Sequence, residues 1–395
     1  MVKKVVILGC GNVGSDVARY VAEDMSDVEI TVADYKLDVA QALAEEIGGK
    51  AVQFDATVKE DVEKVLEGAD IVFNGVGPFH RFAMPIIEQA IASKVNYVDI
   101  NDDFDVAQQL VTSTHYDEAA KEAGISIIFG AGSTPGLTNI LSRWAVDELE
   151  STESIEIVWG VSFTPNLSTA VIDHMFHCLI GDVPQFIDGE MRQVPAWSGE
   201  KTIALKPPFN EKSFVFSGHA EPITLPHYLK EVKNVTVRST FFQEYGNELY
   251  KQLINLGLVS NTKVEKFNIS PRQFIAEFMN SEEAIELLTP DYGDEPGGAV
   301  FRVDVSGLLN ALPTTITYEF QLILDESAKD PTSVCGAAIV CEVLNDNVKE
   351  TGLFAPEAII DPQQFIERVM KRLDATLFRQ VVTNDVVATK EALTI

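Results

Sequence analysis

The sequence is short of basic residues. Its 395 residues contain 30 Lys and Arg against 60 Asp and Glu, which gives a formal net charge of −30 at pH 7. A surface of this charge repels nucleic acids and anionic membranes, so we expect neither as a partner. Any phosphate group would have to be bound by backbone amides rather than by a basic patch.

Cysteines and long apolar segments are also scarce. The cysteines form no C-x-x-C pair and have no metal-ligand spacing, which favours reduced thiols, a cytoplasmic location and no bound metal. No segment is long and apolar enough to span a bilayer, so we expect a soluble protein. The absence of G-x-S-x-G, Walker and H-E-x-x-H motifs argues against hydrolases, kinases and metalloproteases. The four cysteines are Cys10, Cys178, Cys335 and Cys341.

What the sequence does have is 46% hydrophobic residues and a length typical of two or three domains. Over residues 1–131, apolar runs typical of strands alternate with segments of helical periodicity. This alternation predicts an α/β domain built on a Rossmann-type, doubly wound sheet of six parallel strands. A single helix is expected over Val106–Glu122, before the sixth strand.

The sequence after residue 131 has a different pattern. Apolar and polar residues alternate, most clearly over Ile316–Leu322, as in antiparallel strands with one exposed face. Together with helices such as one expected over Pro271–Leu288, this predicts an α+β domain over 132–332. Helical periodicity returns in 333–395, and we expect this segment to pack back on the first domain.

A glycine-rich motif follows the first predicted strand and opens a helix. Its glycines are spaced G-x-G-x-x-G, as in dinucleotide-binding turns. The first allows the tight turn, the second lets the backbone approach a pyrophosphate, and the third lets helix and strand pack closely. The amino end of the helix then faces the phosphates. The residues expected to bind the cofactor here are Gly9, Gly11, Asn12, Val13 and Gly14.

Asp34 closes the second predicted strand, twenty residues past the last glycine of the motif. A carboxylate at this position can accept hydrogen bonds from both ribose hydroxyls. It would also repel a 2′-phosphate, so the sequence predicts NAD as the cofactor, with NADP as the alternative. Lys36, two residues further on, would soften this preference.

Ligands of open parallel sheets bind beyond the carboxyl ends of the strands, so the residues that follow each strand are candidates. The residues after the third strand suit either an adenine contact or an ordinary turn and helix cap. The glycines after the fourth strand favour contact with the nicotinamide half. The candidates are Asp55, Ala56 and Thr57 after the third strand, and Asn74, Gly75, Gly77, Pro78 and Phe79 after the fourth.

Three residues are candidates for proton transfer. His80 follows the fourth strand and would either exchange a proton with a substrate amine or carbonyl or cap a helix. Asp99 ends the fifth strand and points toward the expected cleft, whereas Asp102 or Asp103 is expected to cap the next helix. Thr134, in the segment that joins the first two domains, is the third candidate catalytic residue.

The substrate side is expected at the domain junction and in the second domain. Gly132–Gly136 is either a loop shaped around a ligand or a hinge, and Gly218–Pro226 either a binding segment or an irregular strand connection. An arginine on the following strand would either pair with a substrate carboxylate or lie on the surface. The candidate substrate-binding residues are Pro135, Gly136, His219, Glu221 and Arg238.

Six short motifs occur in order along the chain: Gly9-x-Gly11-x-x-Gly14, Asn74-Gly75-x-Gly77-Pro78, Tyr97-Val98-Asp99, Gly132-Ser133-Thr134-Pro135-Gly136, Gly218-His219-x-Glu221-Pro222-x-Thr224-Leu225-Pro226 and Gly352-x-x-Ala355-Pro356-Glu357. Together they resemble the saccharopine dehydrogenase family, in particular its reductase-type branch with an amino-terminal NAD(P) domain. The resemblance implies an inserted α+β domain that binds an amino-acid substrate and forms a homodimer, and a carboxyl-terminal segment that folds back on the first domain.

The resemblance also implies hydride transfer between a nicotinamide cofactor and a carbon–nitrogen bond. Saccharopine-forming members carry an aspartate before the Pro-Gly pair that follows the sixth strand, where this chain has Thr134. The neutral residue resembles the lysine 6-dehydrogenase branch, which oxidatively deaminates lysine. We therefore expect an NAD(P)-dependent amino-acid dehydrogenase that acts on a basic amino acid or its conjugate. The alternatives are an NADP-dependent saccharopine-type reductase and a non-catalytic nucleotide-binding sensor.

Overall fold

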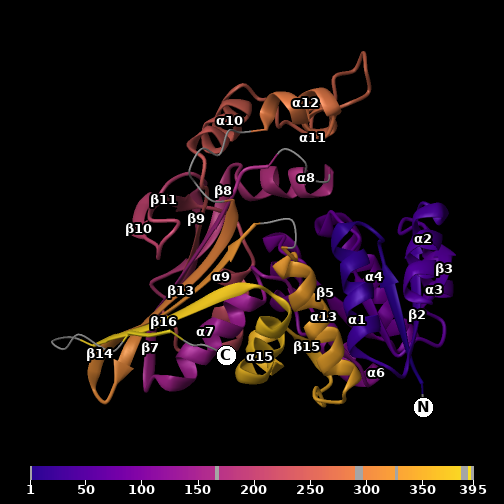
Figure 1. Ribbon diagram of the computed structural model, residues 1–395, viewed down its shortest axis with the longest axis horizontal. Coiled ribbons are helices and arrows are strands. Elements are labelled where there is room, and N and C mark those ends of the chain that lie inside the picture. The colour runs from indigo at the N-terminus through magenta and orange to yellow at the C-terminus, as the bar shows by residue number, and fades with distance from the viewer. Residues whose placement is uncertain (1, 165–168, 290–296, 325–327, 384–389, 393–395) are drawn as a thin grey trace.

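The computed structural model describes residues 2–164, 169–289, 297–324, 328–383 and 390–392. Two sheets lie side by side, and helices fill the space between and around them (Figure 1). The first sheet and its helices come mainly from the amino-terminal third of the chain. The second sheet comes from the rest, and the carboxyl-terminal segment contributes to both sheets.

The first sheet is parallel throughout, with the strand order β15-β6-β5-β4-β1-β2-β3. Its central strands are the most apolar runs of the region, and all four residues of β4 are buried. The order reverses direction at β1, which has β2 on one side and β4 on the other, as in dinucleotide-binding sheets. The Rossmann-type prediction is confirmed. The strands are β1 (Lys3–Leu8), β2 (Val28–Asp34), β3 (Lys50–Gln53), β4 (Ile71–Asn74), β5 (Asn96–Asp99), β6 (Ser126–Ile128) and β15 (Gly352–Phe354).

Helices cover both faces of this sheet. The single helix expected over Val106–Glu122 is wrong, because two helices occupy the segment. Ser113 lies between them, and its hydroxyl accepts a hydrogen bond from the backbone N–H of His115 at 3.1 Å. Such a local side-chain bond competes with helix continuation. The helices are α1 (Asn12–Asp24), α2 (Leu37–Ile47), α3 (Lys59–Leu66), α4 (Phe79–Ser93), α5 (Phe104–Thr112) and α6 (His115–Ala123).

The second sheet has ten strands and is mixed. Along its main path the order is β10-β11-β12-β7-β13-β14-β16-β17, and β12 also pairs with β8, which pairs with β9. The alternation predicted over Ile316–Leu322 is only partly present in β14. Ile316, Tyr318 and Phe320 are fully buried on one face, but Glu319 and Gln321 on the opposite face are buried as well. The strands are β7 (Ser151–Val161), β8 (Asp182–Ile187), β9 (Glu190–Pro195), β10 (Lys201–Ala204), β11 (Glu211–Phe216), β12 (Asn234–Phe241), β13 (Gly298–Leu309), β14 (Leu312–Ile323), β16 (Ala375–Thr383) and β17 (Lys390–Ala392).

The helices of this second region lie between the sheets and in an outer arm (Figure 1). The single helix expected over Pro271–Leu288 is also wrong, because Ser281 caps a new helix by accepting a hydrogen bond from the N–H of Ala284 at 3.2 Å. Within the described ranges, no helix combines the length and apolar character needed to cross a bilayer. The helices are α7 (Leu137–Glu148), α8 (Thr169–Cys178), α9 (Glu221–Tyr228), α10 (Glu244–Asn255), α11 (Pro271–Met279) and α12 (Glu282–Leu288).

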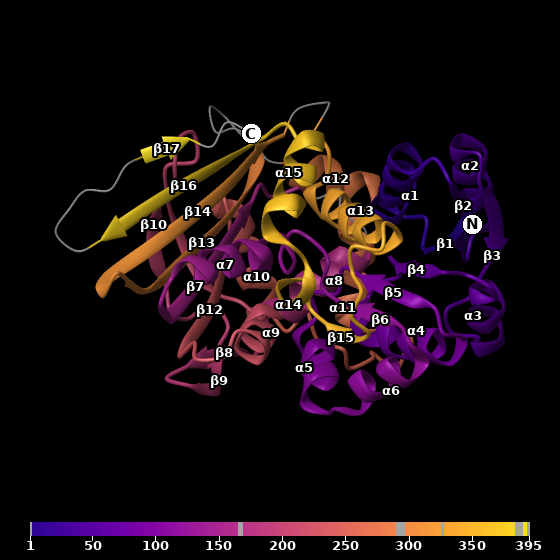
Figure 2. The same ribbon diagram turned by 90° about the horizontal axis from the view of Figure 1, so that it is seen from below.

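The carboxyl-terminal segment connects the two sheets (Figure 2). Helix α13 (Pro331–Leu344) packs against α1, and its Gly336 lies so close to the first sheet that a Cβ there would be 3.0 Å from the ring of Phe73. Strand β15 then extends the first sheet. After α14 (Pro356–Ile359) and α15 (Pro362–Arg372), β16 joins the second sheet beside β14. The segment therefore holds the two regions against each other.

Candidate functional site

The glycine-rich turn between β1 and α1 is shaped by close backbone contacts. Gly9 has a φ of +86°. A Cβ on Gly14 would lie 1.9 Å from the carbonyl oxygen of Gly9, so glycine is needed for α1 to pack against the turn. At Gly11, by contrast, a Cβ would have no neighbouring atom within 4 Å. The turn thus leaves room for a pyrophosphate to approach Gly11 while its other glycines hold strand and helix together.

Asp34 lies at the end of β2 beside this turn. Its Oδ2 accepts a hydrogen bond from the backbone N–H of Cys10 at 2.8 Å, and its Oδ1 accepts one from the backbone N–H of Lys36 at 2.9 Å. No side chain caps α1, and no acidic residue lies in its first turn, which includes Asn12 and Val13. A fixed carboxylate, an open glycine and an uncapped helix end fit the ribose and phosphates of a dinucleotide.

The segment Asp55 to Thr57 forms a local turn after the outer strand β3. Oδ1 of Asp55 accepts hydrogen bonds from the N–H and the hydroxyl of Thr57, at 2.8 and 2.7 Å. Ala56 is partly buried against the core of the first domain. These contacts account for the turn, and contact with adenine remains a proposal.

The loop after β4 packs directly on the glycine-rich turn. The N–H of Gly75 donates to the carbonyl of Leu8 at 2.8 Å, and a Cβ on Gly9 would lie 3.0 Å from the carbonyl oxygen of Gly75. The Gly77-Pro78 pair that follows is half-buried and leads into α4, whose first residue, Phe79, is buried in the core. The two glycine segments therefore form one edge of the sheet.

Asn74 and Asp99 belong to a buried network that ties the ends of the central strands together. Asn74 donates to the hydroxyl of Tyr97 at 2.9 Å, and this hydroxyl donates to Oδ2 of Asp99 at 2.7 Å. Oδ1 of Asp99 accepts from the backbone N–H groups of Asn101 and Gly130. Burial raises the pKa of Asp99 to about 6. Both carboxylate oxygens are already bonded, which favours a positioning role over proton transfer to a substrate.

His80 is held at the start of α4 by the carboxylate of Asp103. The backbone N–H of His80 donates to Oδ2 of Asp103 at 2.7 Å, and its Nδ1 lies 3.0 Å from the same oxygen. This hydrogen bond raises the pKa of His80, whose side chain is 31% exposed. Of the two expected caps, Asp102 and Asp103, it is Asp103 that occupies the cap position of α5, but its carboxylate turns to His80 and His174 and makes no capping hydrogen bond.

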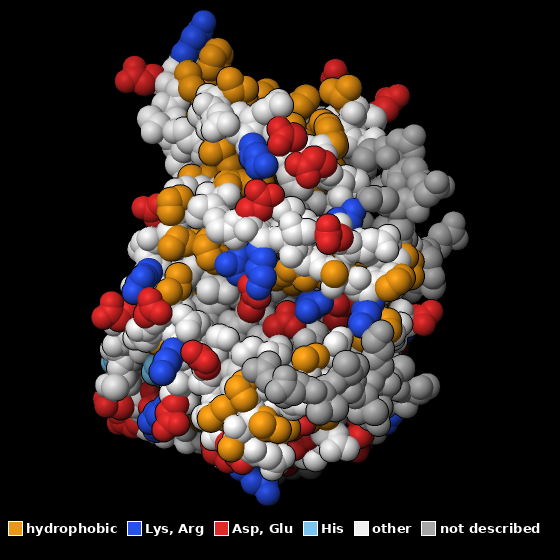
Figure 3. All heavy atoms as spheres, turned by 90° about the vertical axis from the view of Figure 1, so that its left-hand side faces the viewer, with side chains coloured by type: hydrophobic (Ala, Val, Ile, Leu, Met, Phe, Trp, Pro, Cys, Tyr) orange, Lys and Arg blue, Asp and Glu red, His pale blue; other side chains and the backbone are white. Residues whose placement is uncertain are grey.

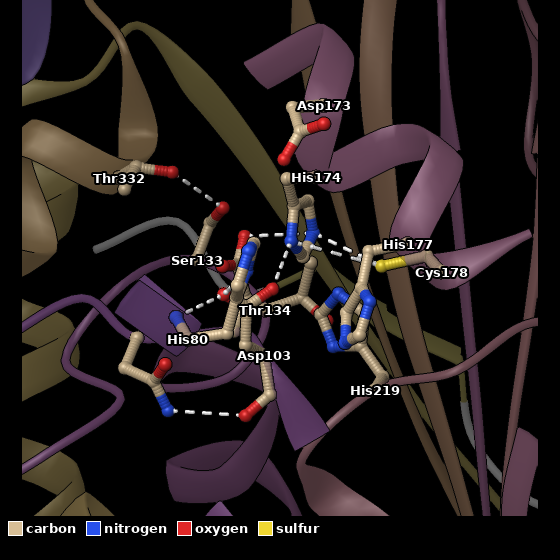
Figure 4. A network of polar contacts seen from close by, with 12 residues as sticks. His80, Asp103, Ser133, Thr134, Asp173, His174, His177, Cys178, His219 and Thr332 are labelled. Atoms are coloured by element: carbon tan, nitrogen blue, oxygen red, sulfur yellow. Dashed lines mark hydrogen bonds and ion pairs between the residues drawn. The ribbon is translucent and has the colours of Figure 1, made fainter. Parts of the chain in front are cut away.

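His174 and Cys178 enter the same cluster from α8 (Figure 4). Nδ1 of His174 lies 2.9 Å from Oδ1 of Asp103, and its Nε2 lies 3.0 Å from Asp102 and 3.1 Å from the sulfur of Cys178. Burial alone would lower the pKa of His174, but the neighbouring carboxylates raise it well above its usual value. Burial of Cys178 raises its pKa to about 11. Sequence reasoning missed both residues, although their spacing of four places them on one helix face.

Thr134 and His219 meet at the carboxylate of Glu221. The hydroxyl of Thr134 donates to Oε1 of Glu221 at 2.6 Å, and Nδ1 of His219 lies 2.7 Å from Oε2. Both His219 and Glu221 are almost completely buried. Burial alone would raise the pKa of Glu221, but the imidazole and the hydroxyl lower it. The junction loop and the Gly218–Pro226 segment therefore share one polar centre.

Behind this centre, Asn139 connects the last three motifs of the sequence. Its amide donates to the hydroxyl of Thr224 at 3.0 Å and to Oε2 of Glu357 at 2.9 Å, while its oxygen accepts from the N–H of Gly136. Gly136 has a φ of +124° and, like Pro135, is buried. Burial raises the pKa of Glu357 to about 7. Segments from three parts of the chain are thus fixed in one arrangement.

The structure does not bring Arg238 into this cluster. Its guanidinium bonds to Glu156 and to the carbonyl of Gly199, and lies 4.1 Å from the centre of the Phe216 ring. Successive side chains of a strand point to opposite faces, and the neighbouring Val237 faces the core. Arg238 therefore lies on the outer face of the second sheet, away from His219.

Comparison with known proteins shows what the chain is similar to. Residues 5–128 match the family model for the saccharopine dehydrogenase NADP binding domain. This stretch of the chain is therefore similar to the dinucleotide-binding domain of the saccharopine dehydrogenase family. The matched domain supports NAD(P) as the class of cofactor.

Several enzymes with different names are similar to this chain in sequence. The chain is 25% identical over 297 residues to saccharopine dehydrogenase (NADP(+), L-glutamate-forming) of Saccharomyces cerevisiae, an alignment that covers 68% of this chain and 61% of the yeast protein. It is 24% identical over 296 residues to carboxyaminopropylagmatine dehydrogenase of Synechocystis sp., covering 69% of this chain and 71% of that protein. Carboxynorspermidine synthase of Vibrio alginolyticus is 28% identical over 224 residues, covering 48% and 52%.

Two solved structures share the whole fold. Apo saccharopine dehydrogenase (L-Glu forming) from Saccharomyces cerevisiae superposes with a TM-score of 0.68 at 18% identity, covering 96% of this chain and 100% of the other. Homospermidine synthase from Legionella pneumophila in complex with NAD gives 0.62 at 13% identity, covering 100% and 95%. At these identities the match concerns the fold and not the reaction.

Proposed function

We propose that this protein is an NAD-preferring dehydrogenase that oxidises a C–N bond of a basic amino acid or its amine conjugate, as in lysine 6-dehydrogenase-like deamination. One observation carries the proposal. The histidines and carboxylates around His80, Asp103 and Glu221 are gathered beside the loops after β4 and β5, where a nicotinamide bound by the first domain would lie.

The charge of this junction favours an amine. Asp102, Asp103 and Glu221 make their ion pairs with histidines, and within the described part of the chain none is paired with a Lys or Arg. Arg238, the expected partner of a substrate carboxylate, faces the other side of the sheet. A cationic amine is therefore a better fit than a substrate rich in carboxylates. Two of the relatives are named for amine conjugates, which supports the same class.

Each nearby residue has a separate role in this proposal. When bound, the nicotinamide supplies the acceptor for the hydride. His80 would take the proton released from the substrate nitrogen at its Nε2, because its Nδ1 is held by Asp103. Thr134 would position Glu221, and Asp99 would hold the strand ends rather than transfer a proton.

An NADP-dependent, saccharopine-type reductase is the second candidate. The matched family model and the yeast relative both name NADP. The carboxylate of Asp34 opposes it, because it would lie where a 2′-phosphate must fit. A nucleotide sensor without turnover is the third, and the hydrogen-bonded pair of His80 and Asp103 argues against it.

The homodimer, the cytoplasmic location and the division of the chain at residues 131 and 332 also stay proposals. Figure 3 shows the end of the molecule that carries the second sheet, where hydrophobic side chains are interspersed with charges of both signs. Such a mixed surface is found on interfaces and on other protein surfaces alike. Sedimentation of the full chain at several concentrations would show whether it dimerises.

A direct assay tests the reaction. The purified protein is mixed with NAD or NADP and with lysine, ornithine, saccharopine or a carboxylated polyamine, and reduced nicotinamide is followed by absorbance. We expect turnover with NAD and one amine-rich substrate. Turnover of saccharopine with NADP alone would favour the reductase. Tight cofactor binding without any turnover would favour the sensor.

A further inference from the structure

We propose that His174, Cys178 and His219 bind a divalent transition metal of the zinc type at the junction of the two sheets. One ligand atom from each of the three residues lies within 4.8 Å of the other two. Nitrogen and sulfur ligands of this kind suit zinc and cobalt rather than magnesium or calcium. The spacing His-x-x-x-Cys places the first two on one face of α8, and His219 enters from the segment before α9.

The separations suit a tetrahedral ion. Metal–ligand bonds of roughly 2.0 to 2.3 Å place tetrahedral ligands about 3.5 Å apart. Nε2 of His174 is 3.1 Å from the sulfur of Cys178, and the rings of His174 and His219 have centroids 6.0 Å apart and meet edge to face. Small rotations of these side chains would open the space for one ion.

Each histidine is held by a carboxylate on its other nitrogen. Nδ1 of His174 bonds to Asp103, and Nδ1 of His219 bonds to Glu221, so Nε2 of each ring would bind the metal. Nε2 of His174 lies 3.0 Å from Asp102, and the ion would replace this contact. Metal-binding histidines are oriented in this way, because the outer carboxylate fixes the ring and makes it a stronger ligand. The arrangement occurs twice in one cluster, on residues from different elements.

The local charge also favours a cation. Asp103 and Glu221 are 1% and 0% exposed, and Asp102 lies 3.0 Å from Nε2 of His174. Buried carboxylates need a compensating positive charge. Either protonated imidazoles or a metal ion provides it here, and either would also give the buried sulfur of Cys178 a charged partner, because Nε2 of His174 lies 3.1 Å from this sulfur.

This inference does not depend on the proposed reaction. The ligands are residues of the chain, and their occupancy is measured without substrate or cofactor. If His219 binds the metal, the substrate contact expected of His219 would be made through the ion. A failure of the metal test would leave the dehydrogenase proposal intact, and a silent substrate panel would leave the metal site intact.

Metal content is the first measurement. Tag-free protein is loaded with zinc, dialysed against metal-free buffer and measured by mass spectrometry of the metal. We expect about one zinc per chain in the wild type, and at least about tenfold less in Cys178→Ser and His219→Gln. The matched controls Cys335→Ser, at another buried thiol, and His227→Gln, at an exposed imidazole, should keep their zinc.

Cobalt provides a spectroscopic test that needs no variant. The zinc-free wild type is titrated with Co²⁺, and we expect a thiolate-to-cobalt absorption band in the near ultraviolet that saturates at one ion per chain. The band should be absent from Cys178→Ser and present in Cys335→Ser. A wild type that neither retains zinc nor forms this band overturns the proposal, as does a band that survives in a folded Cys178→Ser protein.

Discussion

The cofactor site and the junction site are built in different ways. The core of the cofactor site, the glycine-rich turn and Asp34, consists of backbone groups and one carboxylate, and it lies within the first 34 residues. The junction site consists of charged side chains from residues 80 to 357, contributed by helices and loops of both regions. A site formed by backbone groups of neighbouring residues can be predicted from a short sequence motif. A site made of scattered side chains exists only when every segment has packed.

The two sites also tolerate change differently. At the glycines of the turn, the effect of a substitution depends on the space available for a side chain, so it acts through steric contact. Residues in the junction interact through charge and hydrogen bonds. Substituting one of them leaves its buried partner without a hydrogen bond or a counter-charge. Four experiments, each with a second variant for comparison, test this contrast.

The largest effect is expected at His80. In His80→Gln, the oxidative kcat should fall by about 10² to 10⁴, because the proton acceptor is lost. Asp103 raises the pKa of His80 above 6.5. The wild-type rate should therefore rise with pH through this raised pKa, as the neutral imidazole forms. In Asp103→Asn the rise should move to lower pH, which a pH profile of kcat would show. An unchanged profile in both variants would remove His80 from proton transfer.

Glu221→Gln tests the buried charge of the junction. We expect a loss of about 3 kcal/mol in the free energy of unfolding, because the variant leaves His219 without its carboxylate in a buried place. Urea denaturation measures this loss. Arg238→Gln is the control on the outer face of the sheet, where its partner Glu156 keeps Lys201. A smaller loss of about 1 kcal/mol and an unchanged KM are expected there. Equal losses at both positions would contradict the contrast.

Gly14→Ala tests the packing of the cofactor turn. The new methyl group would lie 1.9 Å from the carbonyl of Gly9, so the turn must shift, at a cost of about 1 to 3 kcal/mol in stability. Gly11→Ala is its counterpart in open space, and should keep its stability while binding NAD at least about tenfold more weakly. Calorimetric unfolding and NAD titration separate the two effects. A stable Gly14→Ala protein with normal affinity would show that the turn is not sterically fixed.

Asp34→Ala should have the smallest effect, on cofactor choice. We expect NAD to bind about tenfold more weakly and NADP to be affected much less, because the lost carboxylate accepts ribose hydroxyls and repels a 2′-phosphate. Asp38→Ala is a control of equal charge change at the start of α2. If both cofactors weaken equally in Asp34→Ala, the ribose role of Asp34 is refuted.

Several local features could be predicted from the sequence for clear physical reasons. The apolar run before Gly9 has to form a buried strand, and the spacing of Gly9, Gly11 and Gly14 specifies a turn that only glycine permits. The alternation over Ile316–Leu322 likewise gave β14 its buried face. The breaks between α5 and α6 and between α11 and α12 were missed, because a single serine hydroxyl outweighed helical periodicity at each.

The junction shows the limit of such reasoning. His219 and Glu221 stood out because they lie within one motif, but His174 and Cys178 belong to no motif that the sequence displays. Asp103 looked like a helix cap, and only its place opposite α8 makes it a partner of two histidines. Arg238 was predicted to contact the substrate. Successive side chains of β12 point to opposite faces of the sheet, however, and that of Arg238 lies on the outer face.

By itself, the sequence determined the parallel sheet, the glycine-rich turn and the position of Asp34, because each depends on backbone geometry and on residues close together in the chain. The tertiary structure decided which charged side chains meet. Asp103, His174 and Glu221 come from segments far apart in sequence, and their pKa shifts and hydrogen bonds arise from the burial that packing imposes. Local patterns specify backbone conformation, whereas the free energy of a buried charge depends on neighbours that only the folded chain brings together.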